Sequence, residues 1–179
     1  RQLFEALDQV AMEFRRGEPL DTLLLSREPV GGLWNNAPKN LLTLSPGQWM
    51  EFAFHPLAEY AQEVGLDIDV NELIVKTELI DYYHRIPERF EVADNIRTDE
   101  DVVRIEPHEK GFQVSSRHLE TGEERLYTCK YLVLATGQRG QLRDLGVAGE
   151  DAPLVTAHYD KPEDFPGERV VVVGGGPVA

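Results

Sequence analysis

The final residues of the chain have the types and the spacing that suit a dinucleotide pyrophosphate. Residues 169–173, Arg-Val-Val-Val-Val, predict a buried strand that leads directly into Gly174-Gly175-Gly176, and Ala179 completes the pattern G-x-G-x-x-A. In this pattern the first glycine permits a tight turn, the second lets the backbone approach the pyrophosphate, and the small third residue lets a helix pack closely on the strand. The amino end of such a helix attracts phosphate. A glycine-rich loop at a strand end is the alternative interpretation.

A second glycine pair follows an earlier apolar run. Gly31 and Gly32 allow the backbone to approach a flat ligand, and Trp34 could stack on that ligand or cover it. A turn with a core tryptophan explains the same residues. Gln48 carries a donor and an acceptor, which suit the polar edge of a flavin ring, although a capped helix start is equally consistent with its surroundings.

A third segment, residues 131–137, ends in Ala135-Thr136-Gly137. These small residues leave room for something bulky beside the backbone. An ordinary exit from a strand to a loop is the alternative. None of these segments identifies a catalytic side chain.

The elements that must position these motifs alternate between helices and strands. Period-3.6 and period-2 patterns predict helices at 2–16, 57–64 and 77–86, a long loop at 29–50, strands at 22–26, 102–106, 112–116 and 125–127, and buried strands at 131–135 and 169–173. Gly65 is expected to end the second helix, Thr77 to cap the third and Pro87 to limit it. The predicted fold class is therefore α/β, with a Rossmann-like parallel sheet and an inserted three-stranded antiparallel meander.

Composition excludes several other functions. The 179 residues carry a net charge of −14, which argues against nucleic-acid binding and against docking on anionic lipid. Cys129 is the only cysteine, so the chain can form neither an internal disulfide nor a CxxC pair, and inert packing is expected of this thiol. The five histidines lack zinc-site spacing, so no metal is predicted. No apolar run reaches the roughly 18 residues of a membrane span, which favours a cytoplasmic protein.

The order of the motifs resembles the flavin-containing monooxygenase superfamily. The resemblance rests on Gly31-Gly32-x-Trp34, Val102-x-x-Ile105, Leu134-Ala135-Thr136-Gly137 and the terminal G-x-G-x-x-A. Within that superfamily, Leu44-Ser45-x-Gly47-Gln48-Trp49-Met50 and Ile80-x-x-Tyr83 are similar to the oxidative stress-induced growth inhibitor family and its bacterial relatives.

This resemblance implies roles for particular residues. Those expected to contact FAD are Glu28, Gly31, Gly32, Trp34, Gln48, Val102, Ala135, Thr136 and Gly137, and those expected to bind NADPH are Gly174, Gly175, Gly176 and Ala179. Glu28 is the candidate for the FAD ribose, although its register against Gly31 is shifted. NADH remains an alternative to NADPH.

The resemblance also implies how the chain is divided. Residues 1–148 would belong to an FAD domain without its first strand and glycine fingerprint, 149–168 to a connector, and 169–179 to the start of the NAD(P)H domain. The chain is therefore expected to be an internal fragment, truncated at both ends and inactive alone.

The implied reaction is reduction of FAD by NADPH, followed by oxygen activation as a flavin hydroperoxide and transfer of one oxygen atom from O2 to a small-molecule substrate. Two alternatives remain open. One is a pyridine nucleotide-disulfide-type reductase, against which the missing CxxC counts. The other is a non-catalytic flavin-binding regulatory protein.

Overall fold

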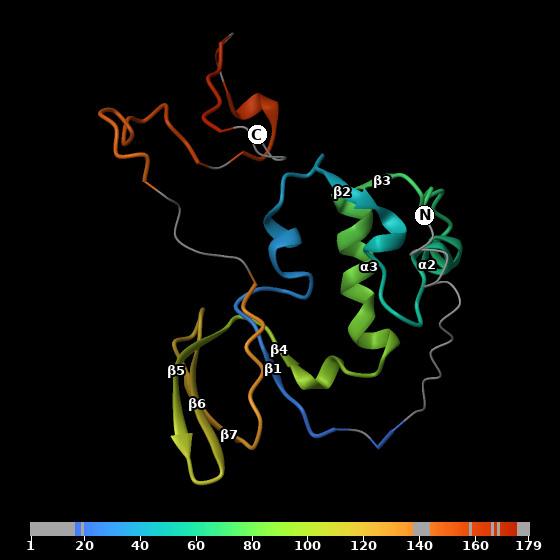
Figure 1. Ribbon diagram of the computed structural model, residues 1–179, viewed down its shortest axis with the longest axis vertical. Helices are drawn as coiled ribbons and strands as arrows, with labels where there is room; N and C mark the ends of the chain where they lie inside the picture. The colour runs from blue at the N-terminus through green and yellow to red at the C-terminus, as the bar shows by residue number, and fades with distance from the viewer. Residues whose placement is uncertain are drawn as a thin grey trace, which may run out of the picture.

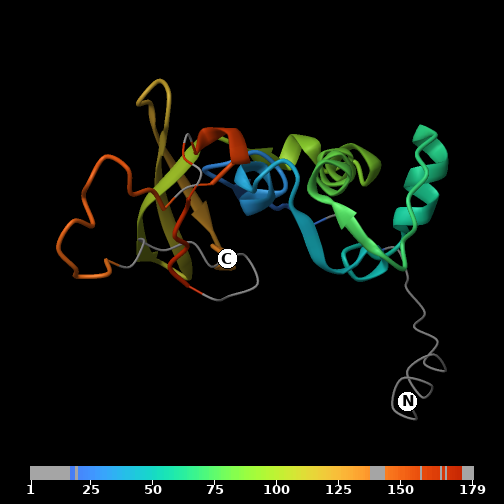
Figure 2. The ribbon, with the colours of Figure 1, turned by 90° about the horizontal axis from the view of Figure 1, so that it is seen from above.

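The computed structural model describes residues 17–18, 20–137, 144–157, 159–165, 167 and 169–174. The helix predicted at 2–16, and Gly175, Gly176 and Ala179 of the terminal motif, lie outside these residues. The described chain has a helical part and a strand meander, with a short parallel strand pair between them (Figure 1). Seen from above, the meander and helix α2 lie at opposite ends of the molecule (Figure 2).

The helical part is built on two helices and a small antiparallel pair. Its elements are the 3-10 helices η1 (Gly32–Asn36) and η2 (Gly47–Trp49), the strands β2 (Leu42–Pro46) and β3 (Leu73–Val75), and the helices α2 (Leu57–Val64) and α3 (Lys76–Arg89). Its core cluster consists of the buried residues Leu57, Tyr60, Ile74, Leu79, Tyr82 and Ile86. Among the described residues, no helix has the length and apolar composition needed to cross a bilayer.

The prediction of one long loop at 29–50 was wrong, because this segment contains η1, β2 and η2. Strand β2 forms through pairing with β3, which is distant in sequence. A side chain adds a hydrogen bond between the two strands: Thr43 Oγ1 of β2 accepts the Ile74 N–H of β3 (3.0 Å). The same hydroxyl donates to the Ser45 carbonyl (2.7 Å). The Pro, Gly and Asn content of residues 29–50 predicts turns and does not indicate that a distant strand will pair with this segment.

The helix at 57–64 was predicted with its correct ends, and Gly65 follows it in the left-handed region (φ 71°). The limits predicted for α3 were wrong. Val75, not Thr77, is the N-cap, because the Lys76 N–H already donates to the Leu41 carbonyl (2.8 Å). Pro87 lies inside the helix, in its last turn, where it removes a single N–H donor.

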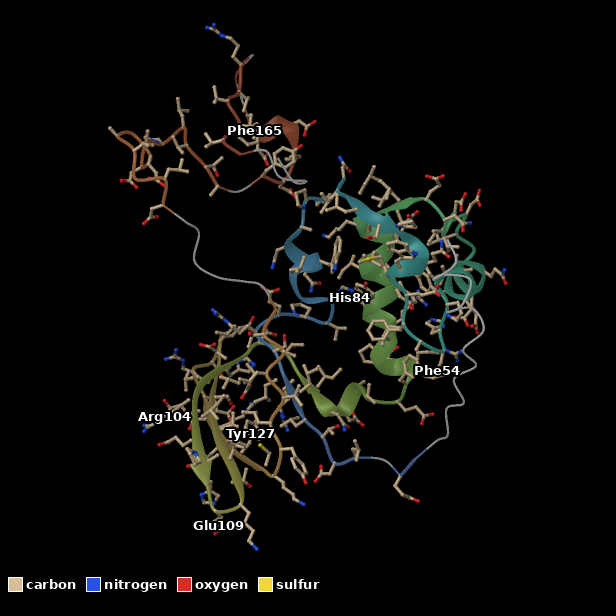
Figure 3. The ribbon with its side chains drawn as sticks, in the orientation of Figure 1. Phe54, His84, Arg104, Glu109, Tyr127 and Phe165 are labelled. Carbon is tan, nitrogen blue, oxygen red and sulfur yellow. The ribbon has the colours of Figure 1, made fainter. Side chains whose placement is uncertain are left out.

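The predicted meander is confirmed as three antiparallel strands: β5 (Glu100–His108), β6 (Gly111–His118) and β7 (Glu124–Cys129), in the order β5-β6-β7. The fully buried carboxylate of Glu100 links all three. It accepts hydrogen bonds from Ser116 Oγ (2.5 Å) on β6 and from Arg125 Nη1 (3.0 Å) on β7. A third hydrogen bond to the Glu100 carboxylate comes from the Tyr127 hydroxyl (3.3 Å; Figure 3).

A short parallel pair supports the predicted α/β class. Strand β1 (Leu24–Leu25) pairs with β4 (Ile96–Arg97), which follows the 3-10 helix η3 (Ala93–Asn95). The meander begins next to this pair, since the Glu100 N–H donates to the Ser26 carbonyl (2.9 Å). The only other regular element described is η4 (Pro162–Asp164).

The buried strands predicted at 131–135 and 169–173 are not present. Both segments lack regular structure, with Tyr131 78 % exposed, Val133 84 % and Val171 88 %. A run of consecutive apolar residues forms a central parallel strand only where neighbouring strands supply hydrogen bonds. Among the described residues, no strand pairs with either run.

Replacement of Glu100 by Ala in the full-length protein is expected to lower the free energy of unfolding by about 3 kcal/mol, because Ser116 and Arg125 lose a buried charged acceptor. Urea denaturation measures this change. The matched control is Glu106→Ala, since Glu106 pairs with Arg104 at the exposed face of the same strand and its loss should cost within about 0.5 kcal/mol. Equal losses in the two variants would contradict the role given to Glu100.

Candidate cofactor site

The turn that contains Gly31, Gly32 and Trp34, here called the glycine–tryptophan turn, is fixed by its backbone conformation and by helix α3. Gly31 (φ 102°) and Gly32 (φ 53°) both lie in the left-handed region. A Cβ on Gly31 would collide with Cδ1 of Ile80, whereas a Cβ on Gly32 would meet nothing within 4 Å. The left-handed φ of Gly31 favours glycine there, with Ile80 of α3 close beside it, and Gly32 leaves open space beside the backbone.

Asn35 holds this turn together and was missed by the sequence analysis. Its side-chain amide nitrogen lies within hydrogen-bond distance of three carbonyl oxygens, of Pro29 (3.1 Å), Val30 (3.1 Å) and Gly32 (3.0 Å). An asparagine four residues after a glycine turn residue is a usable signal, because asparagine side chains readily bond nearby backbone.

Asn35 also connects the turn to α3. Its Oδ1 lies 3.0 Å from Nε2 of His84, and its backbone carbonyl accepts a hydrogen bond from Lys76 Nζ (3.2 Å). Figure 3 shows His84 between α3 and the turn. The orientation of the glycine pair thus depends on three α3 residues, namely Lys76, Ile80 and His84.

Trp34 is partly buried and packs against the core cluster. This contact favours the alternative that Trp34 is a core residue of the turn. Contact between the indole and a ligand remains a prediction.

Two tyrosines of α3 hold the segment that follows η2. Tyr82 Oη donates to the His55 carbonyl (2.6 Å) and accepts the Phe52 N–H (2.7 Å), and Tyr83 Oη donates to the Met50 carbonyl (2.9 Å). Burial raises the pKa of Tyr82, and it raises the pKa of Tyr83 to about 12. Both hydroxyls are therefore neutral donors at any physiological pH.

Glu28 lies at the entrance to the turn. Its backbone N–H donates to Ser26 Oγ (3.2 Å), and its carboxylate accepts a hydrogen bond from Asn36 Nδ2 (3.2 Å). The structure therefore brings Glu28, Gly31, Gly32 and Trp34 together in one turn.

The remaining predicted FAD residues lie on other elements. Gln48 is exposed on η2, with Nε2 at 3.5 Å from Asn71 Oδ1. Val102 is 38 % exposed on β5, at an irregularity of the strand register. Residues 135–137 are exposed and have no regular structure.

Of the terminal motif, the structure describes Gly174. Its φ of 130° and the open space around its Cβ position leave its backbone accessible. The described turn and this glycine offer backbone groups and small side chains, which suit the binding of a large flat or phosphorylated ligand more than acid–base catalysis.

Comparison with known proteins agrees with a nucleotide-binding role. Residues 9–179 match a family model described as pyridine nucleotide-disulphide oxidoreductase. A ferredoxin–NADP reductase of Ignicoccus hospitalis is 45 % identical over 60 residues, which are 34 % of this chain and 19 % of that protein. A probable indole-3-pyruvate monooxygenase of Arabidopsis thaliana is 28 % identical over 110 residues, 59 % of this chain and 26 % of that protein.

The fold is also similar to a solved bacillithiol disulfide reductase from Bacillus cereus, with a TM-score of 0.67 at 20 % identity. The similarity covers 80 % of this chain and 40 % of the reductase. The chain thus spans about a fifth to a quarter of the two curated relatives and less than half of this structure.

Asn35→Asp in the full-length protein is expected to lower the free energy of unfolding by about 2 kcal/mol, because a carboxylate oxygen would face carbonyl oxygens where the amide nitrogen now donates. Thermal or urea unfolding measures the loss. Asn40→Asp introduces the same charge at an exposed position nearby and should change stability little. Equal stability of the two variants would show that the Asn35 side chain does not stabilise this turn.

Proposed function

Because the chain belongs to the pyridine nucleotide-disulphide oxidoreductase family, whose model matches residues 9–179, we propose that the whole protein is an FAD-dependent oxidoreductase that takes electrons from a nicotinamide dinucleotide. That match carries the proposal, since it covers almost the whole chain. It also confirms the resemblance to the flavin-containing monooxygenase superfamily, together with the similarity to a plant monooxygenase. The assignment to the oxidative stress-induced growth inhibitor family remains a prediction.

The residues of the glycine–tryptophan turn fit FAD. The open side of Gly32 allows a flat ring or a phosphate to approach the backbone, and side-chain atoms of Ile80 close the other side of the turn at Gly31. In this proposal Gly31, Gly32 and Trp34 lie along FAD, Asn35 orients the two glycines, and Glu28 lies near the ribose. Bound FAD would supply the transfer of electrons from the nicotinamide to the second substrate.

The second dinucleotide would bind at the terminal motif. Gly174 has the accessible backbone that this role needs, and Gly175, Gly176 and Ala179 complete the motif in the sequence. We accordingly propose that residues 1–148 belong to the FAD domain, 149–168 to a connector and 169–179 to the NAD(P)H domain. Val102 and residues 135–137 are proposed to contact FAD from the meander and the segment after it, and Gln48 from η2.

For the reaction itself, we propose that the protein is an NADPH-dependent monooxygenase, which transfers one atom of O2 to a small-molecule substrate. The similarity to the probable indole-3-pyruvate monooxygenase supports this choice. A disulfide-type reductase is the second candidate, favoured by the likeness of fold to the bacillithiol disulfide reductase. Cys129 is the one cysteine of the chain, so that reaction would need a further thiol from elsewhere or a low-molecular-weight disulfide as substrate.

One experiment separates these functions. The full-length protein, loaded with FAD, is mixed with NADPH or NADH in the presence of isotopically labelled oxygen, and NAD(P)H oxidation and oxygen uptake are followed. A monooxygenase would consume oxygen and place the label in an added substrate. A reductase would oxidise NAD(P)H without oxygen when a disulfide is added. A protein that binds FAD but oxidises neither nucleotide under any of these conditions would support the non-catalytic alternative.

Gly32→Ala is expected to weaken FAD binding about tenfold or more, because the new methyl group would occupy the open space beside the turn. The matched control is Gly65→Ala, since Gly65 has a similar φ (71°) and equally open surroundings at the end of α2. Each substitution should cost about 1 kcal/mol of stability from backbone strain. FAD titration of both proteins makes the comparison, and equal affinities would place FAD elsewhere.

Replacement of both Gly174 and Gly176 by Val should raise the KM for the nicotinamide cofactor about tenfold or more and leave FAD bound, because the side chains would enter the path of the pyrophosphate. The control is Gly167→Val, in the preceding segment, which should leave the KM for the nicotinamide cofactor unchanged. Loss of FAD with unchanged nicotinamide binding would mean that the two sites have been assigned in the wrong order.

A further inference from the structure

Three side chains capable of binding a metal ion lie close together at helix α2. Glu59 and Glu63 are four residues apart on α2 and therefore lie on one face of the helix, and His55 lies two residues before the helix begins. One ring nitrogen of His55 and one carboxylate oxygen from each glutamate all lie within 4.8 Å of one another. The spacing of the five histidines predicts no metal site, because this group contains a single histidine and two glutamates.

The histidine of this group is buried and incompletely paired. His55 is 1 % exposed, and its Nδ1 has no hydrogen-bond partner among the described residues. Removal of a polar atom from water without a partner is unfavourable. The ring cannot easily turn toward solvent, because it stacks on Tyr82 (centroids 5.5 Å apart) and lies edge-on to Tyr60 (6.4 Å).

The two glutamates add a second reason for a cation. Both are exposed, and like charges four residues apart on a helix repel each other. Glu59 also pairs with Arg89 Nη2 at 3.3 Å, but each side chain of this pair is 47 % exposed, so the interaction is weak and can be exchanged for another.

We propose that His55, Glu59 and Glu63 bind a divalent transition-metal ion of the zinc type, with water at the remaining positions. One imidazole nitrogen and two carboxylates are suitable ligands for Zn²⁺, and the imidazole disfavours Mg²⁺ and Ca²⁺, which prefer oxygen alone. Metal–ligand bonds of about 2 Å require the three ligand atoms to lie well within the 4.8 Å that separates them at most here. The exposed glutamate side chains can supply that movement, while the stacked imidazole stays in place.

The ion would stabilise the packing between α2 and α3. His55 lies just before α2, and its carbonyl accepts the hydrogen bond from Tyr82 of α3 (2.6 Å). Glu59 and Glu63 lie on successive turns of α2. A metal bound to all three would therefore hold α2 on the segment that Tyr82 already fixes, without contributing to the cofactor turn.

The test uses the full-length protein, freed of metal by a chelator, and titration calorimetry with Zn²⁺ and separately with Mg²⁺. The expected result is one zinc ion bound, a higher melting temperature with zinc, and no comparable effect of Mg²⁺. Glu59→Gln and Glu63→Gln, which keep the shape of an exposed side chain, should each lower zinc affinity at least about tenfold. Glu88→Gln, an exposed glutamate of α3, should leave it unchanged.

A second measurement identifies the imidazole without altering the core. Cu²⁺ bound at this site should show nitrogen hyperfine coupling in its electron paramagnetic resonance spectrum, and Glu63→Gln should lower the copper affinity at least about tenfold. The proposal would be overturned by zinc affinity that is the same in both α2 variants and in Glu88→Gln, by the absence of zinc binding, or by a copper spectrum without nitrogen coupling.

Discussion

The contact between Gly31 and Ile80 is the constraint on which the arrangement of the candidate cofactor site depends. With no side chain at position 31, the turn approaches α3 so closely that a Cβ there would collide with Cδ1 of Ile80. Once Ile80 faces the turn, the helical repeat places His84 on the same side, where it reaches Asn35. Tyr83 lies on the neighbouring face and holds the Met50 carbonyl. One helix therefore orders two segments that are far from it in sequence.

The meander depends on a different interaction, the buried carboxylate of Glu100. Its side chain gathers donors from β6 and β7, while its backbone N–H bonds to Ser26 at the end of β1. Three hydrogen bonds, one of them from a guanidinium group, compensate the removal of this charge from water. Since Ser26 also accepts the Glu28 N–H on its side chain, the glycine turn and the meander start from the same short stretch of chain.

The features that the sequence predicted correctly are those with local causes. Helix α2 and its end at Gly65 follow from apolar spacing and a left-handed glycine, and the meander follows from alternation and its two turns. Features with distant causes were missed. Strand β2 needs β3, the first turn of α3 needs the Leu41 carbonyl, and the runs at 131–135 and 169–173 need partner strands that the described residues do not supply. Asn35 was missed because its importance comes from three carbonyls that only the folded turn brings together.

The glycines of this chain show why a motif alone does not define a binding surface. Gly31 and Gly32 are adjacent and both have positive φ, yet one faces a side chain of α3 and the other faces open space. Gly65 also has a positive φ and open space around its Cβ position, for a purely structural reason, the end of a helix. Positive φ therefore explains why glycine is present, and open space permits a ligand, but neither identifies one. Gly32 differs from Gly65 because hydrogen bonds from Asn35 hold its turn in a fixed orientation, as a site that binds a rigid ring requires.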